Sequence, residues 1–109
     1  MSPIVIVPGR WSAGALQYHA ENVASQIANN AAFNCNAGRV IVTSRGWAQR
    51  QAFLDALRKV YASRVACRVA YYPGAAQRYR RWVRDAAARG LDVEQVCLFV
   101  YRYILCESC

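Results

Sequence analysis

The stretch Ile4-Val5-Ile6-Val7, ended by Pro8-Gly9, decides how this chain folds. A run of β-branched residues favours a strand, and an unbroken apolar run favours one buried on both faces, as in a parallel sheet. Val40-Ile41-Val42 is a second run of this kind. Between the two runs, from Ala13 to about Asn30, apolar residues recur at steps of three and four, which is typical of a helix with one buried face. Strand, helix and strand at this length predict a βαβ unit with a right-handed crossover.

Two more helices are expected further along the chain. Apolar positions recur at helical spacing from Trp47 to about Tyr61, and again from Ala75 to Arg89 after the Pro73-Gly74 break. Ser12 is the expected N-cap of the first helix, because its hydroxyl can accept from an unpaired N–H of the first turn. We therefore expect an α/β fold, a partial three-layer domain with a short parallel sheet, with strands at about 3–8 and 39–44 and helices at about 13–31, 47–62 and 75–89.

Gly90 is the one candidate boundary, so the sequence predicts a domain over residues 1–90 and a C-terminal tail over 91–109. Within that tail, the apolar segment 93–105 fits a helix and a strand equally well. The chain has 109 residues, of which 56% are hydrophobic, which suits one globular domain. Its longest apolar run, Val96–Leu105, is interrupted by Arg102 and is about half of the roughly 20 residues that a membrane span needs. Without a basic leader at the start, we expect a cytoplasmic protein and no membrane partner.

An odd number of cysteines without an export signal favours reduced thiols over a disulfide framework. The five are Cys35, Cys67, Cys97, Cys106 and Cys109. The last two form a CxxC at the extreme end, which we interpret as free terminal thiols, with a zinc or redox pair as the alternative. No metal site is expected.

Cys35 is the candidate catalytic residue, because it lies on the predicted connection between a helix and a strand. A thiol placed there can be exposed, with its thiolate favoured by neighbouring backbone N–H groups. The amides of Asn30, Asn34 and Asn36 could hydrogen-bond an oxyanion or simply cap the helix end, and residue types alone favour capping. His19, the sole histidine, is sixteen positions away, about 24 Å if the intervening chain is helical, so a Cys/His pair is not expected.

The residues around Cys35 resemble the catalytic domain of aldehyde dehydrogenases. The resemblance is carried by Ser2-Pro3-Ile4-Val5-Ile6-Val7, by 21–27, by 30–43 and by Phe53-Leu54-Asp55-Ala56-Leu57. Cys35 matches the family's nucleophile, Asn30 the asparagine five positions before it, and Arg39-Val40-Ile41-Val42 the strand that follows. Ala32 and Phe33 depart from the family, which usually has glycine and glutamine there.

The resemblance implies a mechanism. The Cys35 thiolate attacks an aldehyde to give a thiohemiacetal, whose oxyanion is held by the backbone N–H of Cys35, with Asn30 and Asn34 in supporting positions. Hydride then passes to NAD or NADP, and hydrolysis of the resulting thioester gives an acid. The family's general-base glutamate and its coenzyme-binding domain precede the Ser-Pro segment and are not matched by this chain. We therefore expect a fragment of such an enzyme that binds no coenzyme and does not turn over alone.

The net charge of +8, carried by thirteen arginines and a single lysine, leaves other functions open. One alternative is a small basic module that binds RNA or an acidic protein through the arginines of 78–89. Nucleic acid is nevertheless not the expected partner, because Tyr79 and Trp82 fall on the predicted buried stripe, where bases cannot stack on them. A third interpretation is a structural remnant whose exposed apolar strand edges favour aggregation. An oligomer is compatible with all three.

Overall fold

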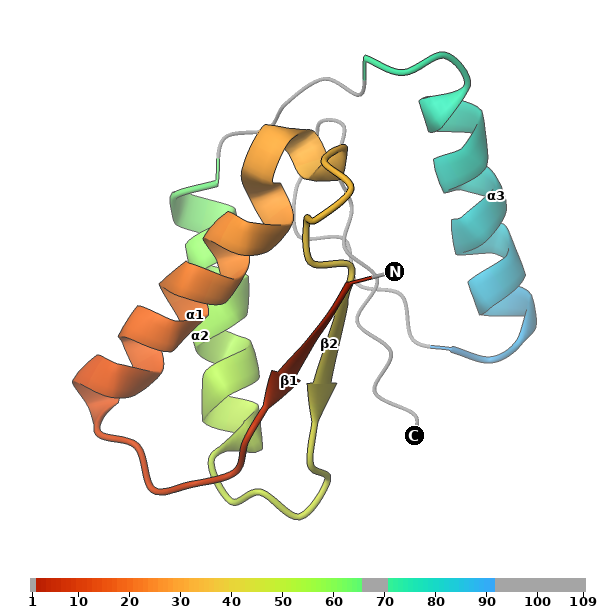
Figure 1. Cartoon of the computed structure of the whole chain (residues 1–109). Helices are drawn as coiled ribbons and strands as arrows, with labels where there is room; N and C mark the ends of the chain where they lie inside the picture. Colours follow the sequence, from red (N-terminus) through yellow and green to blue (C-terminus); the bar gives the residue numbers. More distant parts are fainter. Residues whose placement is uncertain (1, 66–70, 92–109) are drawn as a thin grey trace. The chain divides into compact units, whose positions relative to one another are not determined.

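The computed structural model describes residues 2–65 and 71–91 (Figure 1). The chain divides into two compact units, Met1–Val65 and Ala66–Cys109. Its elements are β1 (Pro3–Ile6), α1 (Ala13–Ala28), the 3-10 helix η1 (Asn29–Ala32), β2 (Val40–Thr43), α2 (Arg50–Ser63) and α3 (Ala75–Ala88). The predicted α/β class is confirmed, and every predicted element is present with its ends within three residues of the expected ones. Apart from Leu91, the predicted tail over 91–109 lies outside the described residues.

The two strands pair in parallel, as the βαβ prediction requires. Pro3 pairs with Val40 and Ile6 with Thr43, so the two strands match along their whole length. The N–H of Arg39 donates to the carbonyl oxygen of Ser2 at 3.0 Å, which extends the hydrogen-bonded ladder by one step. Parallel pairing needs a long crossover, and α1 provides it.

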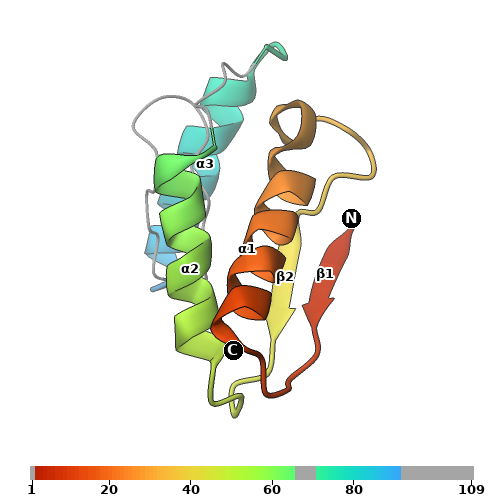
Figure 2. The ribbon, with the colours of Figure 1, turned by 90° about the vertical axis from the view of Figure 1, so that its left-hand side faces the viewer.

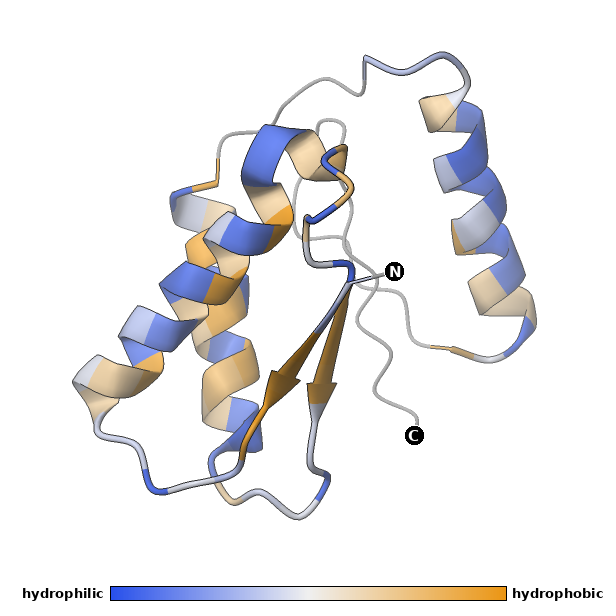
Figure 3. Ribbon diagram, viewed as in Figure 1, coloured by the Kyte–Doolittle hydropathy of each residue, from blue (hydrophilic) through white to orange (hydrophobic). Residues whose placement is uncertain are grey.

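Helices α1 and α2 lie on one side of this sheet and pack against each other (Figure 2). The predicted cap is confirmed, since the Ser12 hydroxyl accepts from the N–H of Ala15 at 3.1 Å. Small residues on α1, Ala20 and Ala24, are almost fully buried and let the helices approach closely. Figure 3 shows the hydrophobic faces of the two helices and the strands. The core residues of this unit are Ile6, Leu16, Ala20, Val23, Ala24, Ile27, Phe53, Leu54, Leu57, Val60 and Tyr61.

The other face of the sheet carries a row of exposed valines. Val5, Val40 and Val42 are 65%, 40% and 46% exposed, and Val5 pairs directly with Val42. We call these three residues the valine row. The prediction that the strands are buried on both faces is therefore wrong for the residues described in this unit. A run of β-branched residues indicates a strand whose two faces can both be buried. It does not predict that the layers covering both faces come from the same chain.

Tryptophan rings fill the connections that lead from each strand to its helix. Trp11 lies between β1 and α1, Trp47 between β2 and α2, and their ring centroids are 4.9 Å apart in an edge-on arrangement. Both rings also contact Phe53 of α2, at 6.0 and 5.8 Å. The indole Nε1 of Trp47 donates to the carbonyl oxygen of Gly9 at 2.8 Å. Trp47 was expected to begin a helix, but α2 begins at Arg50. Trp47 instead packs between the connection after β1 and the connection after β2.

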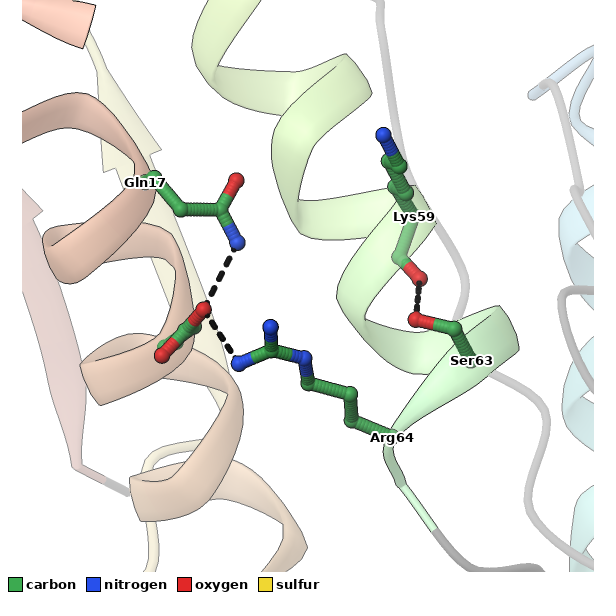
Figure 4. Close-up of polar contacts among 5 residues, drawn as sticks. Gln17, Lys59, Ser63 and Arg64 are labelled. Atoms are coloured by element: carbon green, nitrogen blue, oxygen red, sulfur yellow. Dashed lines mark hydrogen bonds and ion pairs between the residues drawn. The ribbon is translucent and has the colours of Figure 1, made fainter. Parts of the chain in front are cut away.

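A polar contact joins α1 to the end of α2 at the surface (Figure 4). Oε1 of Glu21 accepts from Nε2 of Gln17 at 2.8 Å and from Nη1 of Arg64 at 2.6 Å. Gln17 is one turn before Glu21 on α1, whereas Arg64 is the C-cap of α2. The two helices are thus linked by charge as well as by their apolar faces.

In the second unit, described over residues 71–91, α3 follows a left-handed glycine. Gly74 has φ of 76°, a conformation that glycine adopts without the steric penalty of a side chain, and it precedes the first residue of α3. Within the described ranges of the chain, no helix has the length and hydrophobicity that crossing a bilayer would require.

Candidate active site

Cys35 lies on the connection between η1 and β2, and its side chain is exposed, as predicted from the sequence. Its carbonyl oxygen accepts a 3.5 Å hydrogen bond from the hydroxyl of Ser2, the residue before β1. The turn is closed by backbone bonds from the N–H of Phe33 to Asn30 and from the N–H of Ala37 to Asn34. Among these bonds of residues 2–65, none uses the N–H of Cys35. That N–H is therefore available as a donor next to an accessible thiol.

Between the end of α1 and the turn that carries Cys35, the backbone reverses its handedness. Asn30, Ala31 and Ala32 have φ of 47°, 55° and 60°, so three successive residues with side chains adopt the left-handed region. Asparagine tolerates this conformation, whereas each alanine in it costs roughly 1–2 kcal/mol. Ala31 is 7% exposed, so its methyl group is packed into the unit and helps to hold the reversal in place. This reversal ends α1 at Ala28, three residues before the predicted end.

The two asparagines predicted to support Cys35 lie together. Nδ2 of Asn30 donates to Oδ1 of Asn34 at 2.9 Å, across the left-handed run. The carbonyl oxygen of Asn34 also accepts from Nη2 of Arg39, at 3.5 Å. The bond between the two amides holds the turn in shape directly before Cys35.

His19 has a structural setting far from the cysteine along α1. Its ring lies 4.7 Å from the ring of Trp11 and 5.3 Å from that of Tyr18, centroid to centroid. From His19 to the end of the helix at Ala28 the rise is about 14 Å. His19 belongs to the aromatic cluster at the start of α1, whereas Cys35 follows the opposite end of that helix.

Gly38 is a residue of this turn whose importance the sequence did not suggest. It is buried, and a Cβ added there would lie 2.5 Å from Cδ1 of Ile4 and 3.3 Å from Cγ1 of Ile27. The chain can therefore pass between β1 and α1 on its way into β2 because this residue has no side chain. The only sequence signal was a glycine directly before the second strand.

The remaining candidate chemistry is metal binding. Cys67, Cys97 and the Cys106–Cys109 pair lie outside the described residues. Within residues 2–65 and 71–91, no group of three or more His, Cys, Asp or Glu is placed to hold a metal ion.

In comparisons with known proteins, no family model, no curated protein and no solved structure matches this chain.

Proposed function

We propose that this chain is part of an aldehyde dehydrogenase catalytic domain in which Cys35 is the nucleophile. The proposed compartment is the cytoplasm, where thiols stay reduced. The observation that carries the proposal is the position of an exposed Cys35 in the turn that follows three left-handed residues, Asn30–Ala32, with two residues between them. Backbone held in such a sparsely populated region clusters at active sites, because the surrounding structure must over-determine it. The resemblance described above supports the same residue.

The proposed covalent step uses groups of this turn alone. The sulfur of the Cys35 thiolate attacks the carbonyl carbon of an aldehyde, forming a C–S bond, while the π electron pair moves onto the oxygen. The resulting oxyanion accepts a hydrogen bond from the Cys35 N–H, and the bond between Asn30 and Asn34 supports the turn that positions this donor. The thiolate arises by loss of the thiol proton to water. The product of this step is a thiohemiacetal anion on Cys35.

The residues described here do not fit a nicotinamide coenzyme. In a βαβ unit, a dinucleotide pyrophosphate binds where the first strand leads into the helix. Here a Cβ at Gly9 would lie 3.1 Å from Nε1 of Trp11, and the carbonyl oxygen of Gly9 is bonded to Trp47. The side chains of Trp11 and Trp47 thus lie against Gly9, where the pyrophosphate would have to approach the backbone. We therefore derive no hydride step, and we propose that these 109 residues stop at the covalent adduct.

We further propose that the two strands belong to a larger sheet of a three-layer domain. Parallel sheets usually have both faces covered. The valine row is exposed at 40% or more on each of its members, on the face that α1 and α2 do not occupy. A second layer over this row would complete the arrangement expected from the sequence.

Acylation of the thiol tests the proposal without a coenzyme. A 4-nitrophenyl ester of acetic acid would acylate Cys35, forming a thioester and releasing nitrophenolate, and peptide mapping by mass spectrometry would locate the acetyl group. We expect Cys35 to be the first of the five cysteines acylated, and Cys35→Ser to abolish the fast release of nitrophenolate. Cys67→Ser removes a different thiol and should leave that release unchanged.

Equal acylation of all five cysteines would reject Cys35 as the nucleophile. A second experiment addresses the incomplete site: the chain is mixed with NAD or NADP and a panel of aldehydes. We expect no increase in reduced coenzyme. Turnover that depends on Cys35 would show that the chain contains a coenzyme site and a general base after all.

A further inference from the structure

Helix α3 carries a strongly basic surface in the second unit. Residues 71–91 contain five arginines and a single acidic residue, Asp85, and all five arginines are exposed. Each residue advances about 100° around a helix, so steps of four, three and four residues return to the same side. Arg78, Trp82, Asp85 and Arg89 follow these steps, and Arg81 flanks them. These five residues are called the Trp82 face.

Trp82 is exposed in the middle of this surface. Its exposed fraction is 59%, whereas Ala86 on the apolar stripe is 8% exposed and Tyr79 and Val83 are half-buried. The expectation that Trp82 lies on a buried stripe is therefore wrong. Helical spacing placed it on the stripe together with Tyr79, Val83 and Ala86, but the covered part of the helix surface does not extend to Trp82. An indole ring between guanidinium groups is a surface on which a planar base can stack.

Asp85 holds two arginines only weakly: Arg81, which flanks the Trp82 face, and Arg84, which lies outside it. Nε of Arg81 lies 3.6 Å from Oδ2 of Asp85, and Nε of Arg84 lies 3.8 Å from Oδ1, both longer than a hydrogen bond. The side chains of Arg81 and Arg84 are 74% and 77% exposed. Their terminal nitrogens therefore remain accessible to an anion, and such exposed pairs are easily replaced.

A second aromatic group lies just before the helix. The rings of Tyr71 and Tyr72 are 5.1 Å apart, and these residues are 57% and 51% exposed. Nη1 of Arg78 donates to the carbonyl oxygen of Pro73 at 3.1 Å, which fixes the segment carrying both tyrosines to the first turn of α3. Exposed rings and arginines thus share one short segment of chain.

We propose that the Trp82 face binds single-stranded nucleic acid, with a base stacked on the Trp82 indole and phosphates contacted by Arg78, Arg81 and Arg89. The charge complementarity is direct, because guanidinium groups pair with phosphate oxygens through two parallel N–H donors. Stacking on an exposed ring requires an unpaired base, which a single strand provides and a duplex does not.

Two other anionic partners fit this surface less well. A lipid bilayer would have to receive the apolar stripe, but Ala86 is buried and Tyr79 and Val83 are half-buried. An acidic polypeptide would provide carboxylates for the arginines, but it has no planar ring at every unit of its chain, as a nucleic acid has, to stack on the exposed indole of Trp82. Vesicles of anionic phospholipid and polyglutamate are therefore the competitors to compare with a single strand.

Fluorescence anisotropy of a labelled oligouridylate, titrated with the whole 109-residue chain, tests the proposal. We expect Trp82→Ala to weaken binding about tenfold or more, which is within the range of a lost base–aromatic stack. Three phosphate contacts predict that the logarithm of the binding constant falls with the logarithm of salt with a slope of about −2. Far-UV circular dichroism confirms that each variant keeps its helices.

A matched pair of double variants separates the Trp82 face from net charge. Arg81→Ala with Arg89→Ala removes two charges near Trp82, whereas Arg80→Ala with Arg84→Ala removes two from the opposite side of α3. The first pair should weaken binding several-fold more than the second. Asp85→Asn, which removes the one carboxylate of the face, should tighten binding about threefold.

Binding that is unchanged in Trp82→Ala, or equal losses in the two double variants, would overturn the proposal. Preference for vesicles of anionic phospholipid would assign the surface to membranes, and preference for polyglutamate would assign it to an acidic protein. Equal affinity for a duplex of the same length would exclude the stacking contact.

Discussion

Gln49 holds the backbone of Trp11 with both ends of its side-chain amide. Nε2 donates to the carbonyl oxygen of Trp11 at 2.8 Å, and Oε1 accepts from the N–H of Trp11 at 2.7 Å. The two residues are 38 positions apart, so these bonds join the connection after β1 to the connection after β2. Together with the contact between the Trp11 and Trp47 rings, these bonds fix the position of the β1–α1 connection relative to the β2–α2 connection.

Replacing Gln49 should therefore destabilise the unit Met1–Val65. Gln49→Glu keeps the size but loses the donor, so the carbonyl oxygen of Trp11 loses its partner and faces a negative charge. We expect the free energy of unfolding in urea to fall by about 1–3 kcal/mol. Gln51→Ala is the matched control, because Gln51 is exposed on α2 and bonds only Asp55, one turn away. An equal loss in both variants would show that the Gln49 bonds contribute nothing specific.

Gly38 should tolerate no side chain. In Gly38→Ala the new methyl group would lie 2.5 Å from Cδ1 of Ile4, so β1 or the turn must move. Overpacking of this kind costs typically about 1–3 kcal/mol, measured as a lower urea midpoint. Gly46→Ala is the control, since no atom lies within 4 Å of its added Cβ. A neutral Gly38→Ala would mean that Ile4 can turn aside freely.

Asn30 should be needed for the chemistry at Cys35 as well as for stability. Asn30→Ala places a third alanine in the left-handed run and removes the 2.9 Å bond to Asn34. We expect acylation of Cys35 by the nitrophenyl ester to slow about threefold to tenfold, the effect of one lost hydrogen bond. Asn36→Ala, at an exposed position of the same turn, should leave the rate unchanged. Equal rates in both variants would contradict a role for Asn30.

The ion pair between α1 and α2 should contribute little. The side chains of Glu21 and Arg64 are 36% and 64% exposed, so solvent screens their 2.6 Å contact. A double-mutant cycle with Glu21→Gln and Arg64→Ala should give a coupling of about 0.5 kcal/mol that decreases at high salt. A coupling above about 2 kcal/mol would indicate a desolvated pair instead.

The sequence predicted the elements well because their signals are local. The β-branched runs, the three helical periods and the Ser12 cap each depend on neighbouring residues, and all are present. The end of α1 was placed too late, because Ala31 and Ala32 are strong helix formers that give no sign of left-handed backbone. That conformation depends on packing and on the bond from Asn30 to Asn34.

The candidate site was predictable in position but not in shape. An exposed thiol between a helix and a strand followed from spacing, whereas the contact of Ser2 with Cys35 joins residues 33 positions apart. Similarly, helical spacing placed Trp82 on the apolar stripe, but spacing does not say where the covered part of a stripe ends. Such contacts between distant segments, and the limits of burial, require the three-dimensional structure.

The valine row makes the stability of this sheet depend on its surroundings. Val5, Val40 and Val42 are exposed on each molecule and can contact another protein surface. A partner that covers the valine row in the folded state, and does not bind the unfolded chain, stabilises the folded state by mass action. The melting temperature of this chain should then rise with the concentration of that partner. Unfolding of the chain alone and unfolding with the valine row covered are thus two different equilibria, and the difference in free energy between them measures how much that cover contributes.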